Sequence, residues 1–410
     1  MNLYAIIILI TLAAGFVLDL VADTLNLKNL KSELPGEFRD VYDDAGYRKS
    51  QEYTRVNTKF GYVESAFSLV VMLLFWFLGG FGWLDGIVSG WFISSIIRGL
   101  VFIGLLVAAN SLLSLPFSVY STFVIEEKFG FNKTTPRTFI LDILKSLGLT
   151  VVIGGPVMAA ILFILEKTGP AAWLYGWAIV TVFTLLLQYI APTWLMPLFN
   201  KFKPVEDGEL KDAVFAFAGK VKFPLKNLFV MDGSKRSSKS NAFFTGFGKN
   251  KRIALYDTLI EKHTVGEIVA ILAHEIGHYK KKHILTGMLI SIVHTGVIFF
   301  LLSIFLGERG LFEAFYMNSM PVYAGLLFFG MLYSPIEMIL SMVMNIVSRK
   351  NEYAADRFAV ESSGLKSEMV SALKKLSGTN LVNLTPHPFM VFMNYSHPPM
   401  LERIRKIEKI

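Results

Sequence analysis

Seven long apolar segments without lysine or arginine constrain the fold of this chain more than any other feature. Each is long enough to cross the roughly 30 Å of hydrocarbon in a bilayer as a helix. They lie at Leu3–Val21, Tyr62–Trp83, Gly99–Val124, Leu147–Leu165, Ala171–Ile190, Ile284–Leu306 and Val322–Val347. The composition agrees, because 53% of the residues are hydrophobic, only 18% are charged and the mean hydropathy is +0.50. These values exclude a disordered chain and indicate a multi-pass membrane protein with a water-facing part.

The basic residues give the predicted helices an orientation. If the segments alternate in direction, the N-terminus and one set of loops carry only Arg98, Lys167 and Arg309 of the 40 lysines and arginines. The positive-inside rule places the other, basic set of loops in the cytoplasm. We therefore expect an integral protein of the bacterial inner membrane or the ER membrane. The net charge of +8 reflects this asymmetry, so no nucleic-acid partner is expected.

Several polar side chains interrupt the apolar segments: Glu64, Asn110, Gln188, His294, Glu337 and Asn345. A polar group facing lipid is costly, so each is expected to face the interior of the helix bundle. Two interpretations are open there. The side chains either form hydrogen bonds between helices or line a wet cavity.

The two longest stretches between or after the apolar segments lie on the basic side and can form one catalytic domain. We predict membrane helices 1–5 with their cytoplasmic loops in 1–190, the first part of the domain in 191–283, helices 6 and 7 in 284–347, and the second part in 348–410. Residues 206–219 are expected to be helical and 232–240 to form a polar, basic loop. Short strands are predicted at Lys226–Met231, Phe243–Phe247 and Arg252–Tyr256.

The pattern His274-Glu275-Ile276-Gly277-His278 predicts a metal site. Positions i and i+4 lie on one face of a helix, so both imidazoles can point at one ion. Glu275 lies between them, where it can take a proton from a water that the metal activates. The chain has no cysteine, so the ligands must be histidine or carboxylate. We expect one Zn²⁺ per chain, with a catalytic rather than a structural site.

A catalytic zinc site needs a third protein ligand and leaves the fourth position to water. Glu352 is the better candidate, because Asp356 lies one helical turn further on and can accept the outer N–H of a ligand histidine. His283 is the alternative, although on a continuing helix it faces elsewhere. Such a carboxylate pair commonly lies on a solvated helix face. Here Ala354 and Ala355 allow close helix packing, which favours the site.

Further motifs are spread along nearly the whole chain. They are Ser50-Gln-Glu-Tyr53, Glu126-Glu-Lys-Phe-Gly-Phe-Asn-Lys133, Pro197-Leu-Phe-Asn-Lys201, Asn241-Ala-Phe-Phe-Thr-Gly-Phe247, Leu255-Tyr-Asp-Thr258, His274–His278, Glu352–Asp356 and Ser396-His-Pro-Pro399. With this ordered set the sequence resembles the type I CAAX prenyl proteases, which are integral-membrane zinc metalloproteases of the gluzincin group.

The resemblance implies a role for each candidate residue. His274, His278 and Glu352 would hold zinc, with Glu275 as the catalytic base. His397, which on its own reads as a turn histidine before two prolines, would stabilise the oxyanion of the tetrahedral intermediate, and Arg403 would support the site. The family's substrate-binding edge strand would consist of Asn241, Ala242, Phe243 and Phe244.

The resemblance also implies a fold and a substrate class. The fold would be mainly α, with seven transmembrane helices around a large water-filled intramembrane chamber, capped by a gluzincin-like zinc metalloprotease domain with a small β-sheet. The substrate would be the prenylated C-terminus of a CAAX protein, and a monomer in the lipid bilayer is expected.

Two other functions compete with this one. The first is a broader membrane-protein quality-control protease without a prenyl requirement. The second is a seven-helix transporter or receptor with a regulatory metal site. A transporter would predict discontinuous helices or repeated halves, which the sequence does not show, and would leave Glu275 without a purpose.

Overall fold

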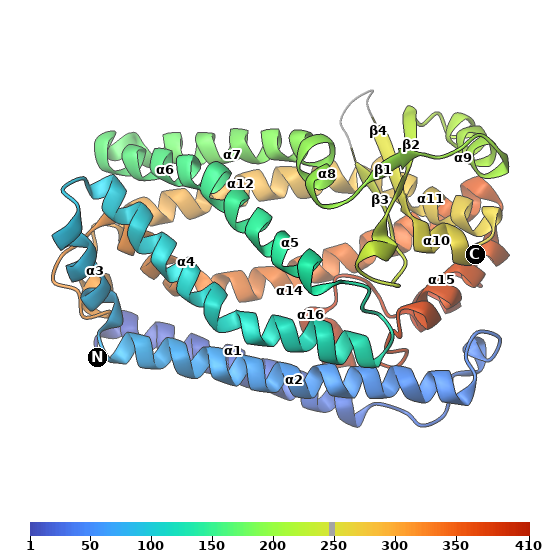
Figure 1. The fold of residues 1–410 in the computed structure, drawn as a ribbon, viewed down its shortest axis with the longest axis horizontal. Coiled ribbons are helices and arrows are strands. Elements are labelled where there is room, and N and C mark those ends of the chain that lie inside the picture. The colour runs from blue at the N-terminus through green and yellow to red at the C-terminus, as the bar shows by residue number, and fades with distance from the viewer. Residues whose placement is uncertain (246–250) are drawn as a thin grey trace.

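The computed structural model describes residues 1–245 and 251–410 and is mainly helical. Seven helices among these residues are long and apolar enough to cross a membrane, which confirms the predicted number. They are formed by α1 Leu3–Lys28, α2 Asp44–Phe77, α4 Ser95–Tyr120, α5 Pro136–Leu149 continued by α6 Gly155–Lys167, α7 Ala172–Ile190, α12 His283–Phe305 and α14 Val322–Ser363. The two termini lie at opposite ends of the molecule, and the β-sheet lies at the end that holds the C-terminus (Figure 1).

The bounds of several membrane helices differ from the sequence prediction: α2 begins at Asp44 rather than Tyr62, the fourth span begins at Pro136 rather than Leu147, and α14 ends at Ser363 rather than Val347. The second span stops at Phe77 rather than Trp83, because Gly79 adopts a left-handed conformation with φ +73° that ends the helix, and α3 Gly80–Trp91 follows. Three spans also contain π-helical turns, which are η2 Ser121–Glu126, η3 Thr150–Gly154 and η5 Ala191–Leu195. Such turns lengthen the spans without breaking them.

The polar residues inside the spans follow both interpretations that the sequence left open. Glu64 and Asn110 line a cavity of about 300 Å³ between α2, α4 and α14. His294, Glu337 and Asn345 line a second cavity of about 310 Å³, where His294 also makes a 3.1 Å hydrogen bond with the hydroxyl of Tyr333 and lies 3.4 Å from the carboxylate of Glu337. The single large chamber that the family resemblance implies stays a prediction.

A four-stranded sheet forms the centre of the water-facing part. It contains β1 Phe202–Pro204, β2 Leu225–Met231, β3 Ala242–Thr245 and β4 Lys251–Tyr256, in the order β1-β2-β4-β3. β2 and β4 are parallel, and the other two pairs are antiparallel. β3 is therefore an outer strand of the sheet. It begins one residue before the predicted Phe243–Phe247, and Gly246 and Phe247 lie outside the described residues.

Short helices surround this sheet. They are α8 Met196–Phe199, α9 Glu209–Lys220, α10 Asp257–Lys262, α11 Val265–Lys280 and α15 Lys366–Thr379. α16 Pro388–Asn394 packs against α1 and α14, α17 Met400–Ile407 packs against α14 and α15, and α13 Arg309–Glu313 lies between the last two spans. α11 begins with a capping box, in which Thr264 and Glu267 satisfy each other's backbone N–H groups. Ile268 and Leu272 of α11 pack in one apolar cluster with Leu228 of β2 and Ile253 of β4.

α14 is one continuous helix of 42 residues that runs from the membrane into the water-facing part. It packs along α11, and this contact joins residues 191–283 to residues 348–410. The contact is close at Gly277, where an added Cβ would lie 3.1 Å from the carbonyl oxygen of Ala355 and 3.2 Å from its Cα. The predicted domain boundary at 347/348 thus falls inside a helix, and the division into domains stays a prediction.

The contact at Gly277 predicts the effect of a larger side chain. Gly277→Val should destabilise the protein by about 1–3 kcal/mol, because the branched side chain must push α11 away from α14. It should also lower bound metal, since the two helices carry the predicted ligands. Thermal unfolding in detergent and metal analysis measure the two effects. Gly219→Val on α9 is the control, because a Cβ there meets no described atom within 4 Å. Equal stability and metal content in the two variants would contradict the prediction.

Candidate metal centre

α11 and α14 bring the three predicted metal ligands to one point. His274 and His278 lie one turn apart on α11, and their Nε2 atoms are 3.2 Å apart. Glu352 on α14 places Oε2 3.4 Å from Nε2 of His274 and Oε1 3.2 Å from Nε2 of His278. One ligand atom from each residue fits within a group whose members all lie within 4.8 Å of one another. The arrangement is that of three ligands around a single ion.

Asp356 and Arg403 form a buried network behind His274. The Nδ1–H of His274 donates to Asp356 Oδ1 at 2.8 Å, which leaves Nε2 directed toward Glu352. Arg403 binds the same carboxylate with two hydrogen bonds of 2.9 and 2.6 Å. Asp356 is 2% exposed and Arg403 4%, so each charge depends on the other for a partner.

The network also sets the protonation of its members. Burial lowers the pKa of His274, but the interactions with the carboxylates of Asp356 and Glu352 together outweigh this effect and raise the pKa to about 9. Burial likewise lowers the pKa of Arg403, and the carboxylates of Asp356, Glu352 and Glu275 more than compensate. Glu275 is half-buried on the same turn of α11, where its charge acts on Arg403.

His283 contacts His278 on the side of the ring that faces away from Glu352. The helix does not continue through this residue as the sequence prediction assumed, because α11 ends at Lys280 and Lys282 adopts a left-handed conformation with φ +61°. His283 then begins α12, with Nδ1 3.2 Å from Nδ1 of His278. Its ring therefore contacts the side of His278 that faces away from Glu352. The sequence offered no sign of this contact, since no glycine marks the turn.

His397 reaches the same group from the segment before α17. Its Nε2 lies 3.4 Å from Oε1 of Glu352, and its Nδ1 lies 3.0 Å from the hydroxyl of Ser396. The side chain is 63% exposed, against 9% for His274 and 19% for His278. It is therefore the histidine of the site that a molecule arriving from solvent can meet.

The segment Asn241–Phe244 lies at the outer edge of the sheet, beside the motif helix. β3 pairs with β4 and contacts α11. The side chain of Asn241 accepts a hydrogen bond from the backbone N–H of Ala242, and Phe244 packs near Tyr279, with ring centroids 6.3 Å apart. The structure thus places the predicted edge strand next to the helix that carries both histidines.

The donor atoms test whether a metal fits this group. Two imidazole nitrogens and one carboxylate oxygen are the ligand set of many catalytic zinc sites. Oε2 of Glu352 is buried and makes no hydrogen bond within the described part of the chain. It lies 3.4 Å from Nε2 of His274 and 3.6 Å from Nη1 of Arg403, and a buried oxygen left without a hydrogen bond marks a place for a bound ion or water. The residues present therefore fit a bound divalent metal.

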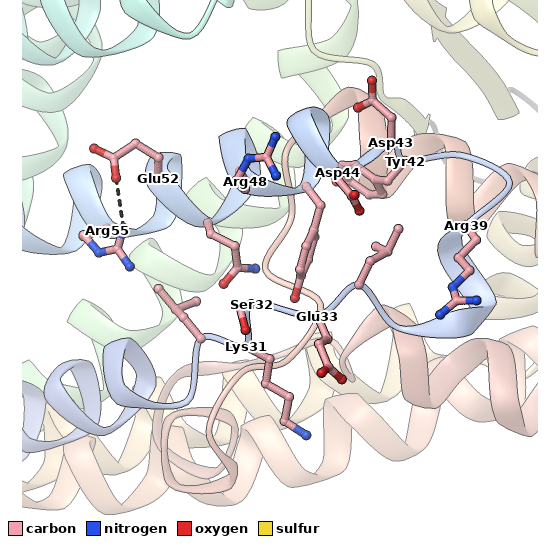
Figure 2. Close-up of a pocket in the computed structure, with 14 residues that line it drawn as sticks. Lys31, Ser32, Glu33, Arg39, Tyr42, Asp43, Asp44, Arg48, Glu52 and Arg55 are labelled. Carbon is pink, nitrogen blue, oxygen red and sulfur yellow. Dashed lines mark hydrogen bonds and ion pairs between the residues drawn. The ribbon is translucent and has the colours of Figure 1, made fainter.

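A larger cavity lies elsewhere, between the α1–α2 connection and one face of α2 (Figure 2). Its volume is about 1170 Å³, and charged residues of both signs line it, including Lys31, Glu33, Arg39, Asp44 and Arg48. Among the described residues, its lining includes none of the predicted site residues. The volume of a cavity therefore does not identify the candidate metal centre of this protein.

Comparison with known proteins places the chain in a family. Residues 23–201 match the family described as CAAX prenyl protease N-terminal, five membrane helices, and residues 204–410 match peptidase family M48. The chain belongs to the CAAX prenyl protease family of M48 peptidases. It is accordingly a membrane metalloprotease, as the resemblance of its motifs predicted.

Relatives of this M48 protease cover nearly its full length. CAAX prenyl protease 1 of Saccharomyces cerevisiae is 36% identical over 93% of this chain and 89% of its own. The Arabidopsis thaliana homolog is 37% identical over 96% and 95%, and the human homolog 33% over 92% and 89%. The crystal structure of S. mikatae Ste24p superposes with a TM-score of 0.92 at 36% identity, covering 99% of both chains. The fold predicted from the sequence is confirmed by this likeness.

The network around Asp356 predicts that Asp356→Asn weakens metal binding in this M48 protease. The amide cannot hold the His274 tautomer with the same strength and leaves the Arg403 charge without its partner. Loss of such a support typically lowers metal affinity about 10- to 100-fold. Titration with buffered free metal measures the change. Glu402→Gln is the control, because Glu402 accepts a bond from Tyr353 at the surface. An affinity equal to that of the control would overturn the assigned role.

Proposed function

We propose that this chain is a zinc endopeptidase that cleaves prenylated CAAX proteins near their C-terminus. The observation that carries the proposal is the buried group of His274, His278 and Glu352 on the HExxH helix and its partner. The substrate class is supported by the relatives that match nearly the whole chain, CAAX prenyl protease 1 of Saccharomyces cerevisiae and its Arabidopsis thaliana homolog.

His274, His278 and Glu352 would hold the zinc. When bound in such a site, zinc acts as a Lewis acid that polarises a carbonyl and acidifies water. Soft thiolate ligands are absent from the sequence, and imidazole nitrogen with carboxylate oxygen suits zinc. Asp356 and Arg403 would keep the His274 ring in the tautomer that leaves Nε2 free for the metal.

Glu275 would act as the general base. Its carboxylate follows His274 on the same turn of α11 and is half-buried rather than hydrogen-bonded into the core, so it can accept and return a proton. His397 would donate to the oxyanion that develops on the scissile carbonyl. Its exposed ring, 3.4 Å from Glu352, supports this role.

The outer strand β3 would bind the substrate backbone. An extended peptide that adds to a sheet edge gains main-chain hydrogen bonds whatever its side chains are. Ala242, Phe243 and Phe244 lie on such an edge beside α11, and Asn241 at its start offers an amide. Recognition of this kind would leave specificity to the prenyl group and to access through the membrane part.

The catalytic part would face the cytoplasm, in the bacterial inner membrane or the ER membrane. The distribution of lysine and arginine supports this orientation, since the loops at the opposite end carry only Arg98, Lys167 and Arg309. All proposed ligands and catalytic residues come from one chain, so a monomer in the bilayer would suffice.

Substitution of the proposed base gives the first test. Glu275→Gln should abolish peptide cleavage and keep full metal content, because the amide cannot accept the proton but leaves the ligands in place. His274→Ala and Glu352→Ala should instead lose metal. Cleavage of a fluorescent peptide and metal analysis measure both effects. If Glu275→Gln cleaved at the wild-type rate, the chain would not use this mechanism, and full metal in Glu352→Ala would return His283 as the third ligand.

His397→Gln gives a second test of the catalytic roles. It should lower kcat by about 10²–10³, because a donor aimed at the developing oxyanion is worth roughly 3–4 kcal/mol. Metal content should not change, since His397 is not among the ligands. Ser396→Ala is a milder control that keeps the ring. A variant with unchanged kcat would remove His397 from the reaction.

The substrate class is tested by a farnesylated CAAX peptide and its unprenylated twin, each with and without a chelator. We expect chelator-sensitive cleavage of the farnesylated peptide at a kcat/KM at least tenfold higher. Equal cleavage of both would favour the broader quality-control protease, which main-chain recognition by β3 would also permit.

A further inference from the structure

The polar loop before β3 is held by the membrane helices. Ser238 donates its backbone N–H to the carbonyl of Phe131 at 3.0 Å, and Ser237 forms an isolated β-bridge with Asn132. Arg236 binds the carboxylate of Asp142 on α5 with two bonds of 2.8 and 2.9 Å. The loop 232–240, which the sequence left without a function, is therefore a docked connection rather than a free surface loop.

Lys239 lies nearest to β3 among these contacts. Its Nζ donates to the hydroxyl of Tyr53 on α2 at 2.8 Å and to Oε2 of Glu126 at 2.9 Å. Tyr53 in turn donates to the other carboxylate oxygen of Glu126. The ammonium also lies 4.4 Å from the centre of the Phe131 ring. Glu126 ends the π-helical turn η2, a kind of distortion that is frequent at functional sites.

The backbone next to Lys239 leads directly into the outer strand. Its carbonyl accepts from the hydroxyl of Thr258 at 2.9 Å. Ser240 bonds through its N–H and its carbonyl to the side chain of Asn380, at 3.1 and 3.3 Å. The carbonyl of Asn241 then accepts from Tyr256 at 3.1 Å, and β3 begins at the next residue. The position of β3 thus depends on a junction between α2, η2 and the end of α15.

We propose that Lys239, held by Glu126 and Tyr53, is a positioning residue that fixes the start of β3 for substrate binding. This inference rests on the proposed role of β3 as the strand to which the substrate adds. The contact ties the strand to two of the membrane helices, so the substrate backbone is held in a set place relative to both the membrane and the metal centre.

The partial exposure of Lys239 and Glu126 indicates that their ion pair contributes little to the free energy of unfolding. The side chain of Lys239 is 35% exposed and that of Glu126 22%, and partly exposed ion pairs add little to global stability. β3 itself has only four residues and pairs on one side with β4. A short outer strand is easily displaced. Loss of the anchor should therefore change substrate binding more than unfolding.

The test compares Lys239→Met and Glu126→Gln with the wild-type chain. Each should raise KM for the farnesylated peptide about tenfold and leave kcat within about twofold, which is the signature of lost binding rather than lost chemistry. The double variant should be no worse than either single variant, because both remove the same interaction. Lys239→Arg, which keeps a cation, should recover most of the binding.

Lys235→Met is the matched control, since Lys235 is an exposed lysine of the same loop with one weak contact at 3.5 Å to the carbonyl of Phe199. It should leave KM unchanged. A loss of metal or melting temperature with unchanged KM in Lys239→Met would overturn the proposal, as would additive effects in the double variant.

Binding measured without turnover separates this inference from the proposed function. In the Glu275→Gln background, the Kd of a fluorescent farnesylated peptide should rise about tenfold when Lys239→Met is added. If the peptide binds equally with and without Lys239, the positioning role fails while the protease assignment stands. If the wild-type chain does not cleave the peptide and Glu275→Gln does not bind it, the proposed function itself fails.

Discussion

Two carboxylates buried one turn apart on α14 are the constraint that the rest of the candidate site satisfies. Glu352 is 3% exposed and Asp356 2%, and neither could remain charged there alone. The charge of Asp356 is balanced by Arg403, and its carboxylate also accepts a hydrogen bond from Nδ1–H of His274. Oε2 of Glu352 makes no hydrogen bond among the described residues and lies 3.4 Å from Nε2 of His274 and 3.6 Å from Nη1 of Arg403. A divalent cation bound by His274, His278 and Glu352 would balance the negative charge of the Glu352 carboxylate.

The same helix connects the site to the membrane. α14 contains a segment apolar enough to cross a membrane and carries Glu352 and Asp356 beyond it without a break, so both carboxylates have a fixed position relative to that segment. α11 adopts its place against α14 because Gly277 presents no side chain at their contact. The contact of Lys239 with Tyr53 and Glu126 ties the segment before β3 to the second and third spans. Both attachments fix the metal centre and the outer strand relative to the helices that are apolar enough to cross a membrane.

Much of this arrangement could be predicted from the sequence, because the signals are local. The absence of lysine and arginine marks the seven spans, and spacing of i and i+4 marks both the histidine pair and the pair of Glu352 and Asp356. The helix ends were harder. Lys282 adopts φ +61° without being glycine, so no sequence rule marks the break before His283. The end of the second span at Phe77 follows from the conformation of Gly79, which the apolar pattern conceals.

The long-range contacts could not be predicted from any pattern. Tyr53, Glu126 and Lys239 lie in three separate segments, and their meeting depends on how the membrane helices pack. Arg403 and His397 entered the prediction only through the family resemblance. Their chemistry depends on a fold that brings α17 and the segment before it to α14, and this is a property of tertiary structure alone.

Anomalous diffraction across the zinc absorption edge, on crystals of the full chain, tests the central claim most directly. We predict one anomalous peak per chain, bonded to Nε2 of His274, Nε2 of His278 and the carboxylate of Glu352, at zinc–nitrogen distances of about 2.0–2.1 Å. A peak bonded to His283 in place of Glu352, or an active enzyme whose crystals show no peak at this group, would contradict the assignment of the metal centre.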